Sequence, residues 1–106
     1  MQMQERMTDR EKNILNSIAL ILDKHLRPGK IMLFGSRTKG NYYGNPDFDV
    51  AVDQKKVDIR KHRKIMEDIE AAVGLYKVDI VYLESVDEFF KDIILKTGET
   101  IYERRS

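Results

Sequence analysis

The sequence contains no cysteine. Disulfides, thiolate zinc sites and cysteine nucleophiles are therefore excluded, and the composition fits a reducing cytoplasm. The sequence also lacks an apolar run near the roughly 20 residues of a membrane span. Its first residues, Met1 to Met7, lack the apolar core of a signal peptide. We therefore expect a soluble cytoplasmic protein that does not enter a membrane.

An excess of charge of one sign is also missing. The 19 basic and 18 acidic residues leave a net charge of +1, so no overall field favours direct binding to nucleic acid. Repeats, linkers and low-complexity segments are absent as well. A chain of 106 residues fits a single domain, residues 1–106, and leaves no room for a separate substrate-recognition domain. That small size implies a partner, and it leaves a homo-oligomer open.

Helical and strand periodicities alternate along the chain. They predict three helices, over residues 8–26, 58–73 and 85–97. They also predict three strands, over residues 30–34, 47–52 and 77–83. Residues 100–102 add a short extended piece. This order predicts one α/β (α+β) domain with helices packed against a small sheet, and periodicity alone does not decide between parallel and mixed strands.

Two capping boxes mark predicted helix starts, Thr8 with Glu11 and Ser85 with Glu88. His25, in the last turn of the first helix, is interpreted as a solvated residue. The last helix carries the adjacent apolar pairs Phe89-Phe90 and Ile93-Ile94, a wide stripe for which core packing is favoured over exposure to a partner or a second copy.

The middle helix has an unusual order of charges. Arg60, Lys61, Arg63 and Lys64 fill its first half, and acids fill its second half. A helix dipole prefers the opposite order. Either a partner uses these cations or they form a solvated face with internal pairs such as Arg63–Glu67 and Lys64–Asp68. The pattern favours the solvated face.

An apolar strand, Lys30–Phe34, runs into Gly35 and Ser36, with a short helical turn expected from Arg37 to Lys39. Such a turn presents free backbone N–H groups, a hydroxyl and the positive end of a helix dipole. These features suit a nucleotide phosphate.

Asp47 and Asp49 stand two residues apart at the start of the next strand, so their carboxylates project from one face. Crowded carboxylates repel each other unless a cation lies between them. A pair of Mg²⁺ ions would suit this cluster. Asp79 interrupts an otherwise apolar strand and is the best third ligand, because an unpaired buried acid is costly.

Together, Gly35-Ser36, ten residues, and Asp47-x-Asp49 resemble the signature of the DNA polymerase β-like nucleotidyltransferase superfamily. The chain is most similar to its minimal nucleotidyltransferases, and the resemblance covers nearly the whole sequence. It implies a mixed sheet. One departure is Pro46, where many members carry Ser, so a backbone contact from that position is in doubt.

The resemblance implies nucleotidyl transfer from ATP with Mg²⁺, two ions in number. Asp47, Asp49 and Asp79 would be the catalytic residues and metal ligands, and Gly35, Ser36 and Arg37 would hold the nucleotide. Minimal nucleotidyltransferases often act as antitoxins that transfer AMP to a tyrosine of a helical HEPN-type toxin, which makes such a toxin the expected partner. Two alternatives remain open: an antitoxin that neutralises its partner by binding alone, and transfer to a small molecule.

Overall fold

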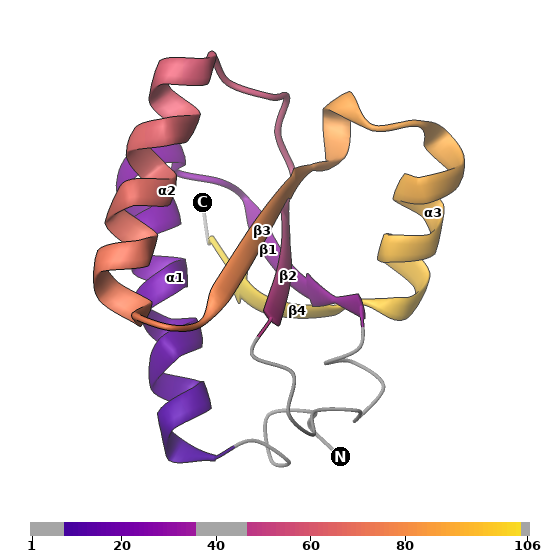
Figure 1. Ribbon diagram of the computed structural model, residues 1–106. Coiled ribbons are helices and arrows are strands. Elements are labelled where there is room, and N and C mark those ends of the chain that lie inside the picture. Colours follow the sequence, from indigo (N-terminus) through magenta and orange to yellow (C-terminus); the bar gives the residue numbers. More distant parts are fainter. Residues whose placement is uncertain (1–7, 36–46, 105–106) are drawn as a thin grey trace.

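The computed structural model describes residues 8–35 and 47–104 (Figure 1). Its elements are α1 (Asp9–Leu26), β1 (Lys30–Phe34), β2 (Asp47–Val52), α2 (Ile59–Val73), β3 (Lys77–Tyr82), the short 3₁₀ helix η3 (Leu83–Ser85), α3 (Glu88–Thr97) and β4 (Glu99–Glu103). Every predicted helix and strand is present, and the extended piece near the end is the strand β4. No helix in the described ranges has both the length and the apolar character needed to cross a bilayer.

The four strands form one mixed sheet in the order β3-β2-β1-β4. β1 is antiparallel to β2 and to β4, whereas β2 and β3 run parallel, joined by the crossover through α2. The predicted fold class and the mixed sheet are therefore confirmed. β3 and β4 are the two edges of the sheet.

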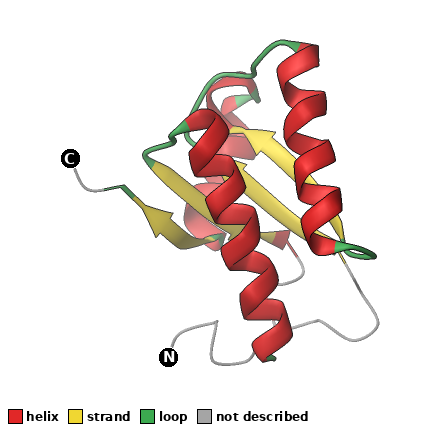
Figure 2. Cartoon of the chain, turned by 90° about the vertical axis from the view of Figure 1, so that its left-hand side faces the viewer, coloured by secondary structure: helices red, strands yellow, loops and turns green. Residues whose placement is uncertain are grey.

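The sheet is covered on both faces because its central strands are apolar on both sides. α1 and α2 lie side by side over one face (Figure 2), where the main core forms around fully buried side chains such as Ile18, Leu33, Phe48 and Ile65. α3 covers part of the opposite face. A smaller cluster of Met32, Ala51, Leu83 and Ile94 lies there.

The ends of α1 follow the sequence signals. The Thr8 hydroxyl accepts from the Glu11 amide while the Glu11 carboxylate accepts from the Thr8 amide, so the predicted capping box is present. Arg27 ends the helix in the left-handed conformation, with φ 49°.

The predicted capping box at the start of α3 is wrong. Asp87 is the N-cap, and its carboxylate accepts from the Phe90 amide at 2.9 Å. Ser85 lies in η3, where its Oγ accepts from the Lys56 amide at 2.8 Å. The Ser-x-x-Glu spacing was misleading because Asp87, two residues after Ser85, provides the cap. Ser85 itself belongs to η3, which directly follows the end of β3 at Tyr82.

His25 is also not the solvated residue predicted. Its Nε2 lies 2.7 Å from Asp68 Oδ2, and its side chain is only 16 % exposed. Lys64 adds the predicted i,i+4 pair to the same carboxylate, at 3.3 Å. The predicted Arg63–Glu67 pair does not form among the described residues. The His25–Asp68 contact therefore joins α1 to α2, and the Lys64–Asp68 ion pair stabilises α2 itself.

The prediction that the whole apolar stripe of α3 packs into the core is also wrong. Ile94 is buried, and Phe90 meets Phe34 edge to face with the ring centroids 6.1 Å apart. Phe89, however, is 76 % exposed, and Ile93 is 42 % exposed. A single sheet face accommodates only one side of a helix, so the adjacent residues point away from it.

β4 is anchored at its far end to α1. The Tyr102 hydroxyl donates to Asp23 Oδ1 at 3.0 Å, and the Arg104 guanidinium forms an ion pair with the same carboxylate. β4, an edge strand, is therefore connected directly to the helical layer.

Candidate active site

The pairing of β2 with β3 brings the three predicted acids to one face of the sheet. In the parallel register Asp49 is opposite Asp79, and Asp47 is opposite Lys77. Paired residues in neighbouring strands point to the same side, about 4.8 Å apart. Asp47, two residues before Asp49 in β2, points to that side as well. All four belong to the first halves of β2 and β3, and both strands begin at their lower ends in Figure 1.

Gly35 lies directly against this acidic face. Phe34, the residue before it, is paired with Asp49 across β1 and β2. Gly35 itself has φ +83°, and a Cβ at this position would stand 2.5 Å from Asp49 Oδ2. Only glycine satisfies both the backbone conformation and this close approach. The expected juxtaposition of a glycine turn and the second aspartate is therefore present.

The electrostatics of Asp49 reflect its neighbours. Partial burial raises the pKa of its carboxyl, and repulsion from Asp79 and Asp47 raises it further, while Lys77 works in the opposite direction. A divalent cation at this face would relieve that repulsion. The donor chemistry thus fits a hard cation such as Mg²⁺, which prefers carboxylate oxygens.

The acids are neighbours, but they do not form a closed ligand cage. Within residues 8–35 and 47–104, no three His, Cys, Asp or Glu side chains are gathered tightly enough to hold an ion. Asp47, Asp49 and Asp79 share a face and influence one another electrostatically. Side-chain rotation toward a common point would be needed to ligate the same ion.

Asp79 was predicted to be a ligand because burying an unpaired acid is costly, and this premise is wrong. Asp79 is exposed on the edge strand β3 rather than buried in an apolar one. The cost of burying an acid therefore does not explain its presence. Its register with Asp49 is what makes it a candidate ligand.

Lys77 is a residue of this face that sequence reasoning missed. It lies two positions before Asp79, so it points to the same side of β3, and it is the cation that lowers the pKa of Asp49. The signal was present in the period-two spacing of Lys77 and Asp79. Its relation to Asp47 required the strand register.

The remaining predicted nucleotide-binding residues, Ser36 and Arg37, lie outside the described residues. So does Pro46. Their expected roles stay predictions.

Comparison with known proteins now gives the family. A family profile described as "Polymerase beta, Nucleotidyltransferase" matches residues 16–106. The chain belongs to this nucleotidyltransferase family. The family predicted from the glycine–serine turn and the Asp-x-Asp spacing is confirmed. No curated protein matches this nucleotidyltransferase significantly.

Solved structures share its fold. A toxin–antitoxin complex with AMP-PNP is 25 % identical, with a TM-score of 0.70, and the match covers 85 % of this chain and 73 % of that one. A tri-AMPylated Shewanella oneidensis HEPN toxin in complex with MNT antitoxin is 23 % identical, with a TM-score of 0.67 and coverage of 90 % and 73 %. A minimal nucleotidyltransferase is 22 % identical, with a TM-score of 0.63 and coverage of 90 % and 96 %.

Proposed function

We propose that this nucleotidyltransferase transfers AMP from ATP to a tyrosine hydroxyl of a helical HEPN-type toxin, and thereby acts as its antitoxin. The observation that carries the proposal is the shared face of Asp47, Asp49 and Asp79 beside Gly35 in a nucleotidyltransferase fold. The toxin as acceptor is supported by two structural relatives, one a toxin–antitoxin complex with AMP-PNP and one containing a tri-AMPylated HEPN toxin.

In the proposed reaction Asp47, Asp49 and Asp79 would hold two Mg²⁺ ions. The chemistry that Mg²⁺ would supply there is stabilisation of the negative charge on the phosphates and on the leaving group. Asp47 and Asp49 would ligate both ions, and Asp79 would ligate the one nearer the acceptor. The backbone at Gly35, with Ser36 and Arg37, would hold the β- and γ-phosphates.

The proposed reaction is a single displacement at the α-phosphorus of ATP. The acceptor oxygen forms a bond to the α-phosphorus while the bond from that phosphorus to the bridging oxygen of the β-phosphate breaks, which releases pyrophosphate. The proton of the acceptor hydroxyl passes to the Asp79 carboxylate. The chain contributes mainly by aligning the reacting atoms.

The test is intact-mass analysis of a HEPN-type protein incubated with this chain, ATP and Mg²⁺. We expect AMP additions with the wild type and none with an Asp47→Asn, Asp49→Asn double variant. Asp92→Asn, an exposed acid on α3, is the matched control and should keep full activity. Full activity in the double variant would contradict the proposed mechanism.

The same experiment separates the alternative functions. Tight binding of the HEPN-type protein without a mass change, and without binding of Mg²⁺–ATP in calorimetry, would indicate an antitoxin that acts by complex formation alone. Because the proposed reaction consumes ATP, we expect it in the cytoplasm.

A further inference from the structure

A second feature of the surface lies at the other end of β3 from the acids. An open groove of about 420 Å³ runs between the start of α2 and the end of β3. Its apolar lining includes Ile59, Ile80, Val81 and Val86. Ile59 is 62 % exposed although it is a large aliphatic residue. In Figure 1 the start of α2 and the end of β3 are the upper ends of these two elements.

The groove has a defined polar floor. His62 Nδ1 lies 2.9 Å from the Tyr82 hydroxyl, and this contact joins α2 to β3 beneath the opening. At the rim, the Lys56 amide donates to Ser85 Oγ. The walls are therefore held in place by contacts within the domain.

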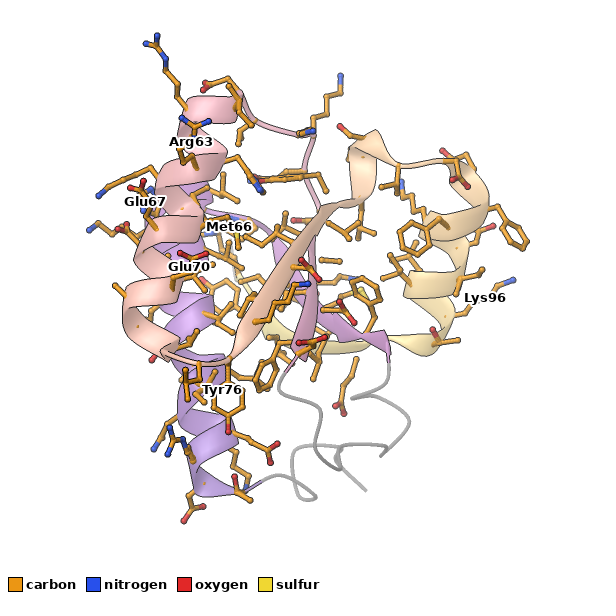
Figure 3. All side chains as sticks on the ribbon, viewed as in Figure 1. Arg63, Met66, Glu67, Glu70, Tyr76 and Lys96 are labelled. Atoms are coloured by element: carbon orange, nitrogen blue, oxygen red, sulfur yellow. The ribbon has the colours of Figure 1, made fainter. Side chains whose placement is uncertain are left out.

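Strong positive charge surrounds this groove. Residues 55–64 contain six lysines and arginines and one acid, Asp58, which is occupied as the N-cap of α2. All six cations are exposed. Lys56 lines the groove itself, and Arg63, one helical turn after Ile59, projects from the same side of α2. Figure 3 shows Arg63 near the upper end of α2, with Glu67 and Glu70 farther down.

Among the described residues, most of these cations form no ion pair with a neighbouring acid. In the described part of the chain, Lys64 alone of the six forms an ion pair, with Asp68. The cations also stand at the positive end of the helix dipole, where like charge is unfavourable. The sequence by itself favours a solvated face, but exposed cations around an apolar groove favour an acidic partner.

β3 provides a third element of recognition. It is an edge strand, and within the described residues no strand pairs with its outer side. An extended polypeptide can add to such an edge through backbone hydrogen bonds, with side chains seated in adjacent pockets. Along β3, the two residues from Val81 to Asp79 span only about 7 Å. A segment that binds at the groove therefore reaches the acidic face.

We propose that this groove and the β3 edge bind an extended acidic segment of the protein that accepts the nucleotide. Apolar side chains of the segment occupy the groove, and its acidic side chains pair with Lys56 and Arg63. The inference rests on the proposed function for the identity of the acceptor. A second copy of the chain fits less well, because a two-fold interface would bring both sets of cations together.

The first test uses a fluorescent peptide of alternating glutamate and valine with one tyrosine, and measures its binding by anisotropy. We expect binding that weakens as salt is raised and falls by about tenfold or more in a Lys56→Glu, Arg63→Glu variant. A Lys12→Glu, Lys96→Glu variant changes the net charge equally, near the start of α1 and the end of α3, and should bind like the wild type. Ile59→Ser should weaken binding without affecting the fold, because its side chain is exposed.

Several results would overturn the proposal. These are no binding by the wild type, equal binding of a peptide with lysine in place of glutamate, or no effect of the Lys56 and Arg63 changes. Binding of a short single-stranded RNA that depends on Lys56 and Arg63 but not on Ile59 would indicate a nucleic-acid surface instead. A dimer in sedimentation that Ile59→Ser disrupts would indicate a second copy.

A second test separates this inference from the proposed function. With the HEPN-type protein as acceptor, the Lys56→Glu, Arg63→Glu variant should raise the KM for that protein and leave Mg²⁺–ATP binding unchanged in calorimetry. Wild-type transfer with no effect of the variant would refute the groove alone. Peptide binding without any transfer to the HEPN-type protein would support the groove and count against the proposed reaction.

Discussion

At the scale of single residues, Asp49 couples stability to the proposed chemistry. Its pKa is raised by burial and by repulsion from Asp79 and Asp47. The folded state therefore favours the protonated carboxyl, and ionisation above its ordinary value of 3.8 costs stability. A residue that destabilises the domain in this way is typical of a functional site.

Asp49→Asn should therefore raise the Tm of the metal-free protein at neutral pH. The same change should lower nucleotidyl transfer by about a hundredfold or more, because a metal ligand is lost. Thermal melts with and without Mg²⁺ and a mass-based transfer assay check both effects. Added Mg²⁺ should raise the Tm of the wild type more than that of the variant. A variant that melts earlier than the wild type in the absence of metal would contradict this account.

Gly35 is required for two separable reasons, its positive φ and its contact with Asp49. Gly35→Ala should destabilise the protein by about 1–3 kcal/mol and should also displace the Asp49 carboxylate. Gly74→Ala is the matched control, since Gly74 has φ +68° but nothing within 4 Å of an added Cβ. Chemical denaturation should show a larger loss for Gly35→Ala. Equal losses would mean that the contact with Asp49 is unimportant.

At the scale of elements, Asp68 joins α1 to α2. The hydrogen bond from His25 lowers the pKa of this carboxyl, burial opposes the shift, and Lys64 adds to it. Because the folded-state value lies below the ordinary 3.8, the stabilisation is complete above that pH. It is lost as the pH falls through the lowered value.

Asp68→Asn should accordingly lower the Tm at neutral pH, and the difference from the wild type should shrink below pH 3.8. Thermal melts across an acid series measure the difference. Glu70→Gln, an exposed acid on the same helix, should show no such pH dependence. A constant difference at every pH would rule out the ion pair as its cause.

The start of α3 offers a test of the corrected cap. Asp87→Ala should cost about 0.5–2 kcal/mol and should remove the hydrogen-exchange protection of the Phe90 amide. Ser85→Ala should leave Phe90 protected and expose the Lys56 amide instead. Exchange measured by NMR distinguishes the two amides. Loss of Phe90 protection in the Ser85 variant would restore the capping box as predicted from the sequence.

At the scale of the whole molecule, the family match covers residues 16–106, and a single domain over residues 1–106 stays a prediction. The last strand, β4, pairs with β1, and Tyr102 and Arg104 at its end contact Asp23 of α1. These contacts join the end of the described chain to its first helix. Long-range pairing of this kind makes unfolding cooperative.

Removal of residues 99–106 should therefore abolish the cooperative thermal transition, because β1 would lose one of its two neighbouring strands. Tyr102→Phe removes only the hydrogen bond to Asp23 and should lower the Tm slightly while the transition stays cooperative. Circular dichroism melts of both variants test the difference. A truncated chain that melts as sharply as the wild type would show that β4 is dispensable.

The sequence by itself determined the helices, most strand limits and the motif from Gly35 to Asp49, because caps, turns and periodicity depend on residues close together in the chain. It also predicted the family. Only the tertiary structure decided that Asp79 lies beside Asp49, that Lys77 joins them, and that Ile59 meets Val81 across a groove. Strand register and the faces that helices present depend on packing between distant segments, and no local pattern encodes them.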